Sequence, residues 1–295
     1  MKEKKGIALL SSFWIKVIAL ITMTFDHVGA MLMQNVGGNY TLAIVFRLIG
    51  RIALPLFCFM IYEGIIHTKN PGKYFLRLGI MATVISVGMI LIEYLPIFNG
   101  FSIRDQGNIF IDLLLGALAV YLLRRKEWYF KLLALLPFGI SIASFIVTST
   151  EFSTTMIIHW FPFFLRMQYH FYSVGMIILF YVGSLLSDLF LKSHSNKSGI
   201  PFETLKGSII ERYSLNIINL GVVFIATGLF FIIAMLLPTQ YVYWHTDYQN
   251  FAIIAGAFVL LYNGQRGYNA KWFQYGSYLY YPVHLLVIYG IGFLI

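Results

Sequence analysis

Long apolar stretches recur along this chain, each about as long as a bilayer is thick, with short polar segments between them. A hydrocarbon core of about 30 Å requires about 20 helical residues at 1.5 Å per residue. Nine segments approach that length: 13–34, 41–66, 74–97, 108–124, 128–149, 170–191, 215–237, 248–263 and 273–294. The sequence therefore predicts an all-α, polytopic membrane protein with about nine transmembrane helices, in a range of eight to ten.

Composition excludes the main alternatives. Hydrophobic residues make up 59% and charged residues 11% of the 295 residues, whereas soluble domains have about 45–50% and about 25%. So few charges cannot cover a soluble surface, which excludes a soluble globular domain, a disordered chain and a β-barrel of alternating pattern. The single cysteine, Cys58, excludes a disulfide framework and a cysteine-based metal cluster, and we expect no metal site.

The basic residues predict the orientation. The net charge is +9, but in a membrane protein the position of Lys and Arg carries more information than their sum, and we expect no nucleic-acid partner. Arg47 and Arg51 lie within the second segment, and only Arg104 and Arg166 lie in outer loops if the N-terminus is inside. The other Lys and Arg residues, of 21 in total, then fall at inner ends: Lys2, Lys4, Lys5, Lys16, Lys69, Lys73, Arg77, Arg124, Arg125, Lys126, Lys131, Lys192, Lys197, Lys206, Arg212, Arg266 and Lys271. This bias predicts a cytoplasmic N-terminus and an outer C-terminus.

The loops are short, so residues 1–295 are predicted to form a single transmembrane domain. The first segment is too long for a signal-peptide core and lacks a small-residue cleavage site, so we expect it to be retained. The longest inner loop, 192–213, is predicted to be a flexible linker. The aromatic segment 150–169 is expected to lie at the membrane interface or to re-enter the membrane. The oligomeric state is not predicted.

Two ionisable residues of the first segment share one helix face. Lys16 lies eleven residues before His27, and three helical turns take about 10.8 residues. His27 should lie roughly 20 Å above the inner end of the helix. An ionisable side chain at that depth is costly and needs a partner or a function.

Asp26 cannot share the helix face of the adjacent His27. We expect it to pair with Arg47 or Arg51, which lie four residues apart on one face of the second segment. Pro55 lacks the backbone N–H that would bond the Arg51 carbonyl, so this helix should kink near Arg51.

Further polar residues lie at a similar depth in other segments. Asn108 and Asp112 are four residues apart at the start of the fourth segment, and His284, with Tyr281, lies near the midplane of the last one. One central-to-outer layer is therefore predicted to contain Asp26, His27, Arg47, Arg51, Asp112 and His284.

Three interpretations of this layer stay open on the residues alone. The arginines and carboxylates would neutralise each other in a purely structural network. Neither His27 nor His284 is needed for that, and histidine is the side chain suited to proton transfer near neutral pH. An enzyme and a proton-coupled transporter or flippase are then equally compatible with the cluster, and a scaffolding membrane protein is a further alternative.

Four stretches resemble the TraX family, membrane proteins linked to N-terminal acetylation of conjugative pilin. In chain order they are KVIALITMTFDHVGAML, FRLIGRIALPLFCFMIYEGIIHTKNPGKYFLRL, GNIFIDLLLGAL and YYPVHLL. Integral membrane acyltransferases that acetylate sugars are a wider resemblance, because they carry an arginine, ten residues and a histidine in their first span. Lys16, ten residues and His27 repeat that spacing with lysine in place of arginine. The lysosomal heparan glucosaminide acetyltransferase is similar at a greater distance.

The resemblance implies a multi-pass enzyme of the bacterial cytoplasmic membrane, with a ten-helix core and acetyl-CoA as acyl donor. It implies His27 as the catalytic residue. On this hypothesis the catalytic set is His27, Asp26, Arg51 and Arg47, and the substrate-binding set is His284, Tyr281, Asn108 and Asp112. The phosphates of CoA would need cations at the inner mouth, for which the candidates are Lys16, Lys69, Lys73 and Arg77. The acceptor would be a pilin-like N-terminus, a glycan or a lipid-linked sugar.

Overall fold

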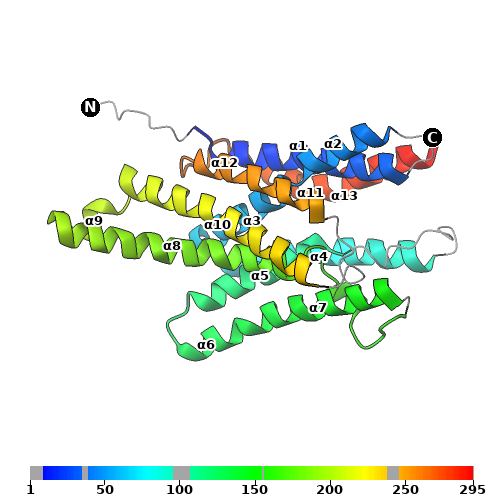
Figure 1. Cartoon of the computed structure of the whole chain (residues 1–295), viewed down its shortest axis with the longest axis horizontal. Coiled ribbons are helices and arrows are strands. Elements are labelled where there is room, and N and C mark those ends of the chain that lie inside the picture. Colours follow the sequence, from blue (N-terminus) through cyan, green and yellow to red (C-terminus); the bar gives the residue numbers. More distant parts are fainter. Residues whose placement is uncertain (1–8, 35–38, 96–106, 155, 238–245, 295) are drawn as a thin grey trace. The chain divides into compact units, whose positions relative to one another are not determined.

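The computed structural model describes residues 9–34, 39–95, 107–154, 156–237 and 246–294. Within these ranges the regular elements are helices (Figure 1), and one isolated parallel bridge pairs Leu10 with Tyr262. The helices are α1 (Ser12–Gln34), α2 (Tyr40–Gly50), α3 (Ala53–His67), α4 (Pro71–Tyr94), α5 (Ile109–Leu123), α6 (Trp128–Leu133), α7 (Leu135–Thr154), η2 (Phe163–Leu165), α8 (His170–Ser198), α9 (Phe202–Leu205), α10 (Ile209–Leu236), α11 (Thr246–Gln249), η4 (Asn250–Ile254), α12 (Ala255–Leu260) and α13 (Lys271–Leu294).

The described residues contain six helical spans that are long and apolar enough to cross a membrane. They are Ser12–Met33, Tyr40–His67, Pro71–Tyr94, Trp128–Thr154, His170–Ser198 and Ile209–Leu236, and shorter apolar helices cover Ile109–Leu123 and Asn250–Leu260. The prediction of a helical, multi-pass membrane protein is confirmed. The count of nine spans and the sides of the two termini stay predictions, and Lys2, Lys4, Lys5 and Arg104 lie outside the described residues.

Local sequence explains where several helices begin and where one breaks. Asn39, Asn70 and Asn108 cap the N-termini of α2, α4 and α5, because each amide oxygen accepts a backbone N–H of the first turn. The second predicted span is divided into α2 and α3 at residues 51–52, four residues before Pro55. The kink expected at Arg51 is confirmed, since proline cannot donate to the carbonyl four residues earlier.

The chain divides into two compact units. The first comprises Met1–Met60, Leu179–Gly228 and Asp247–Ile295. In it α1 lies against α2 and α13 (Figure 1). Residues 25, 26 and 29 of α1 meet residues 46, 47 and 43 of α2, so this pair is antiparallel. Residues 13, 24 and 27 of α1 meet residues 273, 280 and 284 of α13, so that pair is parallel.

The start of α1 is tied to the segment that precedes α13. Leu10 exchanges backbone hydrogen bonds with Leu261 and Asn263, and the amides of Ser12 and Phe13 donate to the carbonyls of residues 265 and 266. On α10, the Asn216 side chain donates to the carbonyls of residues 260 and 262. These bonds set the register in which α1 and α13 begin side by side.

The second unit comprises Ile61–Ile178 and Leu229–Thr246. In it α5 packs on both α4 and α7. The interior of α5 is strongly apolar, and Ala117, Ala119 and Val120 are fully buried. Asn108 and Asp112 occupy the first turns of this buried helix.

The loop predicted over 192–213 is wrong for most of its length. Helix α8 continues to Ser198, α9 covers Phe202–Leu205 and α10 already begins at Ile209. No proline interrupts α8, and Gly199, with φ of 71°, follows its last turn in the left-handed conformation that glycine favours. Lys206 then joins the two long helices through ion pairs with Asp188 at 2.5 Å and Glu211 at 3.2 Å. Burial alone would lower the pKa of Lys206, but these two carboxylates outweigh it and hold that pKa above its ordinary value.

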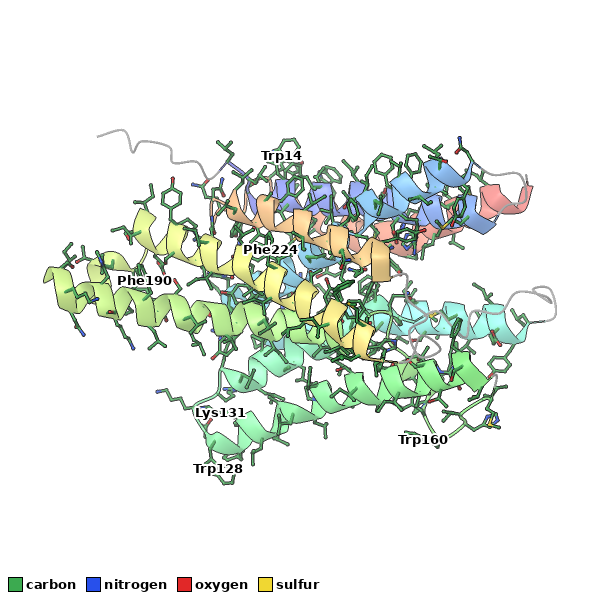
Figure 2. All side chains as sticks on the ribbon, viewed as in Figure 1. Trp14, Trp128, Lys131, Trp160, Phe190 and Phe224 are labelled. Carbon is green, nitrogen blue, oxygen red and sulfur yellow. The ribbon has the colours of Figure 1, made fainter. Side chains whose placement is uncertain are left out.

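Large aromatic side chains point outward at several helix ends. Figure 2 shows Trp14, Trp128 and Trp160 projecting away from the ribbon, and each is more than half exposed. Trp14 lies near the start of α1, Trp128 starts α6, and Trp160 lies in the segment between α7 and α8. Tryptophan at such positions is typical of the two interfaces of a membrane. The expected re-entrant course of 150–169 stays a prediction.

Candidate functional site

Two consecutive residues of α1, Asp26 and His27, face different helices of the first unit. Successive residues on a helix differ by about 100°. Asp26 therefore meets α2, whereas His27 meets α13. Two polar clusters, one ionic and one of imidazole rings, are thus built on one turn of α1.

The ionic cluster consists of Asp26, Arg47 and Arg51. Oδ2 of Asp26 lies 2.8 Å from Nη1 of Arg47, and Oδ1 accepts a hydrogen bond from Nη2 of Arg51. Nη1 of Arg51 also donates to Oε1 of Gln249 at 3.2 Å. The expectation that Asp26 pairs with an arginine is confirmed, and both arginines take part. Asp26 and Arg51 are buried, so the pairing offsets the cost of placing these charges inside the protein.

Glycine allows α1 and α2 to approach closely at this cluster. A Cβ added to Gly50 would overlap the backbone and Cβ of Asp26. A Cβ on Gly29 would lie 2.8 Å from the Ala43 carbonyl oxygen. The short approach brings the Asp26 carboxylate within reach of both guanidinium groups on α2.

The imidazole cluster joins α1 to α13. Nδ1 of His27 lies 2.7 Å from Nε2 of His284, and Nδ1 of His284 lies 2.7 Å from the Tyr280 carbonyl oxygen. The Tyr280 ring stacks on His284 with centroids 5.0 Å apart, and its hydroxyl bonds Oγ1 of Thr24 at 2.6 Å. Tyr281 meets both imidazoles edge-on. His284 is buried, whereas His27 is partly exposed.

Lys16 lies on the same face of α1 as His27, as its spacing predicts. Its Nζ is 5.6 Å from the ring centroid of Phe273, and Phe273 and His284 are also eleven residues apart. Both pairs therefore join the same two parallel helices, three turns apart. The first unit thus brings together Lys16, Asp26, His27, Arg47, Arg51, Tyr281 and His284.

Asn108 and Asp112 belong to the second unit, where protein groups occupy their polar atoms. Both amide hydrogens of Asn108 are used, because Nδ2 donates to the Ala82 carbonyl at 2.7 Å and to Oγ of Ser86 at 2.9 Å. Asp112 is fully buried and accepts the backbone N–H groups of residues 168 and 169 and the hydroxyl of Ser173. Asp112 therefore anchors the segment that leads into α8. Their substrate-binding role stays a prediction.

The other proposed CoA ligands also lie in the second unit. Lys69 and Lys73 are exposed around the start of α4. The Arg77 guanidinium lies 6.0 Å from the Tyr74 ring, and its Nε is buried without a hydrogen-bond partner among the described residues. Arg124, at the end of α5, donates to the Ile65 carbonyl at 2.8 Å. These cations are available for phosphate, but their ligand stays a prediction.

The remaining candidates are the Cys58 thiol and possible metal ligands. The Cys58 side chain is fully buried in α3, which fits an inert core residue. Within the described ranges no group of three His, Cys, Asp or Glu side chains is arranged to hold a metal ion.

The sequence analysis missed one partner in each cluster. These are Gln249 in the ionic cluster and Thr24 in the imidazole cluster. It also gave Tyr280 no role. Gln249 is buried and lies 198 residues from Arg51. An amide in an apolar segment is a weak signal, since many such groups cap helices or bond the backbone. Thr24 lies three residues before His27 on α1, so helical spacing alone could have found it.

Together these observations define a multi-pass helical membrane protein with an ionic cluster and a pair of bonded imidazoles between its helices. The chain belongs to the TraX family, because residues 11–292 match the family described as TraX protein. The TraX resemblance carried by the four stretches is confirmed.

Two curated relatives match parts of the chain. The probable fimbrial assembly protein FimC, serogroup H1, of Dichelobacter nodosus is 31% identical over 137 residues, which cover 45% of this chain and 54% of that protein. An uncharacterized protein of Rickettsia prowazekii (strain Madrid E) is 32% identical over 112 residues, covering 38% of this chain and 37% of that protein. The matches thus span about half or less of each relative's length. No solved structure matches the chain.

Proposed function

We propose that this protein is a membrane acetyltransferase that moves an acetyl group from cytoplasmic acetyl-CoA to an amine or hydroxyl group presented at the membrane. The observation that carries the proposal is the partly exposed imidazole of His27, hydrogen-bonded to the buried His284 inside a membrane protein of the TraX family. A purely structural ion network needs neither ring, whereas acyl transfer needs a group that accepts and returns a proton.

In the proposed reaction His27 acts as general base. It takes a proton from the acceptor as the acceptor nitrogen or oxygen bonds to the thioester carbonyl carbon. The tetrahedral oxyanion then collapses, the carbon–sulfur bond breaks, and the CoA sulfur leaves with the proton that His27 returns. Nε of Arg47 is a buried donor without a partner among the described residues, so Arg47, with Arg51, suits stabilisation of the oxyanion. Asp26 holds both guanidinium groups in place.

The cations predicted at the inner ends are the proposed ligands of the CoA phosphates. In the first unit the candidate is Lys16, three helical turns below His27. In the second unit the candidates are Lys69, Lys73 and Arg77, followed by Arg124, Arg125 and Lys126. Tyr281 meets the His27 ring edge-on and His284 bonds its Nδ1, so both side chains would support the imidazole during acyl transfer. Direct transfer and a transient acetyl-histidine are both compatible with this arrangement.

The proposal includes nine membrane spans, a cytoplasmic N-terminus and an outer C-terminus in the bacterial cytoplasmic membrane. The parallel packing of α1 and α13 supports this topology, because parallel spans end on the same side. With α1 running outward, CoA enters from the side where both helices begin. The acceptor then meets His27 from the outer half.

A pilin-like N-terminal amine is the first acceptor to test. One relative's name states fimbrial assembly, and the TraX resemblance implies pilin acetylation. A glycan or a lipid-linked sugar is the second class, since the wider resemblance is to enzymes that acetylate sugars.

The test uses purified protein in lipid nanodiscs with radiolabelled acetyl-CoA and an envelope fraction as acceptor. We expect CoA release together with label in the acceptor, and a loss of about 10²–10⁴-fold in His27→Ala, the usual contribution of a general base. His194→Ala is the matched control, because this histidine of α8 stacks on Phe190 away from the imidazole cluster. Full activity in His27→Ala would remove the catalytic role. Substrate transport without thioester cleavage would favour the transporter alternative.

A further inference from the structure

We propose that His284 is a positioning residue that fixes the tautomer of His27, with the proton on Nδ1 and the lone pair on Nε2. The catalytic consequence rests on the proposed function, whereas the tautomer itself does not. The ring nitrogen of His27 that accepts the proton would thus be selected by a partner 257 positions away in the chain.

The chain of hydrogen bonds begins at a group that can only accept. The Tyr280 carbonyl oxygen lies 2.7 Å from Nδ1 of His284, and a carbonyl has no proton to give. Nδ1 of His284 therefore carries the hydrogen. In a neutral imidazole the other nitrogen is then an acceptor, so Nε2 of His284 presents its lone pair.

The second bond passes this orientation to His27. Nε2 of His284 lies 2.7 Å from Nδ1 of His27, so Nδ1 of His27 must be the donor. The remaining nitrogen, Nε2 of His27, then holds a lone pair. Nε2 has no hydrogen-bond partner among the described residues, and it is not one of their buried polar atoms that lack a partner. The lone pair is therefore on the accessible side of the ring.

Two aromatic rings hold His284 in the orientation that this chain of hydrogen bonds requires, and a hydrogen bond fixes one of them. The Tyr280 ring lies flat against the imidazole, with an angle of 10° between the planes. Oγ1 of Thr24 donates to the Leu20 carbonyl at 2.9 Å, so it accepts from the Tyr280 hydroxyl. Tyr281 closes another side of the ring, with centroids 5.6 Å apart. His284 is 6% exposed, which suits a group that acts on His27 rather than on a substrate.

Among the residues that the structure describes, no carboxylate takes this part. Asp26 is the acidic residue nearest in sequence, but both of its oxygens are engaged by Arg47 and Arg51 on α2. A general base is usually oriented by a third group that bonds its other nitrogen. Here a neutral imidazole takes that place, so the proton acquired at Nε2 of His27 leaves Nδ1–H donating to His284 throughout the reaction.

The first test measures the tautomer directly in the wild-type protein. NMR of protein with ¹⁵N-labelled histidine rings in lipid nanodiscs distinguishes protonated from unprotonated ring nitrogens, and His27→Gln assigns the His27 signals. We expect a protonated Nδ1 and an unprotonated Nε2 for both His27 and His284, and a coupling between Nδ1 of His27 and Nε2 of His284. A protonated Nε2 on neutral His27 would overturn the proposal, whether or not the protein proves to be an acetyltransferase.

The second test separates positioning from packing by two substitutions. His284→Gln keeps an acceptor near the place of Nε2, whereas His284→Leu fills a similar volume without one. We expect His284→Leu to lower kcat by about 10²-fold or more with little change in KM, and His284→Gln to recover at least about tenfold of that loss. Equal kcat in the two variants would overturn the positioning role. Absent turnover in the wild type, with the expected NMR tautomer, would overturn the proposed function and leave the tautomer standing.

Discussion

Replacing Asp26 by asparagine should destabilise the first unit strongly, although the two side chains have nearly the same shape. The Asp26 carboxylate binds Arg47 at 2.8 Å and also Arg51, and it is buried. A pair of unit charges about 4 Å apart interacts by about 4 kcal/mol at an effective dielectric constant of about 20. Asp26→Asn removes two such attractions and leaves two cations facing each other.

The net effect is smaller than the lost attractions, because a buried carboxylate also has a desolvation cost. Removal of one partner from a buried ion pair usually costs about 3–5 kcal/mol, and we expect a decrease of that size in the free energy of unfolding. Asp188→Asn is the matched control. The side chains of Asp188 and Lys206 are 38% and 34% exposed, and exposed pairs contribute about 0–1 kcal/mol.

The assay is reversible unfolding in mixed micelles with increasing SDS, followed by circular dichroism. Asp26→Asn should shift the midpoint far more than Asp188→Asn. Adding Arg51→Met to Asp26→Asn should restore part of the stability, because it removes one of the two stranded cations. Equal shifts for Asp26→Asn and Asp188→Asn would show that the buried cluster is not electrostatically coupled.

Three further outcomes are expected. Gly50→Ala should cost about 1–3 kcal/mol because its methyl group overlaps α1, while Gly221→Ala, with no atom within 4 Å, should change stability by less than about 1 kcal/mol; the same micelle titration compares them, and equal effects would contradict the close approach. Arg51→Lys should lower acetyl transfer at least about tenfold although it keeps the charge, because one ammonium nitrogen does not reproduce the fork of two guanidinium nitrogens that bind Asp26 and Gln249; a wild-type rate would rule out that contribution. Asp112→Asn should cost about 1–3 kcal/mol of local stability, seen as faster hydrogen exchange at the two backbone amides that it accepts, and unchanged exchange would show that the anchor is dispensable.

Spacing along one helix predicted a substantial part of the candidate site. The eleven-residue interval placed Lys16 and His27 on one face, and both do contact α13. The adjacency of Asp26 and His27 predicted that they face different partners. The four-residue interval placed Arg47 and Arg51 on one face, and Asp26 was expected to pair with one of them; it pairs with both. These relations depend only on 3.6 residues per turn, so they are readable wherever a helix is recognised.

The same local logic failed where helices end. Residues 192–213 have the polar composition of a loop, yet most of them are helical. Helices can continue beyond a membrane as long as no proline or left-handed glycine stops them, and here the stop comes only at Gly199. Depth arithmetic grouped Asp112 with the ionic residues, and that grouping stays a prediction. Depth does not tell where a residue points, and only the structure shows that Asp112 accepts the backbone N–H groups of residues 168 and 169.

The sequence by itself determined that this chain is helical and membrane-embedded, because apolar length and the scarcity of charge are properties of each segment alone. Only the tertiary structure decided that His27 meets His284 and that Arg51 meets Gln249, across 257 and 198 positions. Those side-chain contacts depend on which helices pack together and in what register. In lipid that choice is made by shape, glycine contacts and backbone ties between distant segments rather than by hydrophobic burial, so no single segment encodes it.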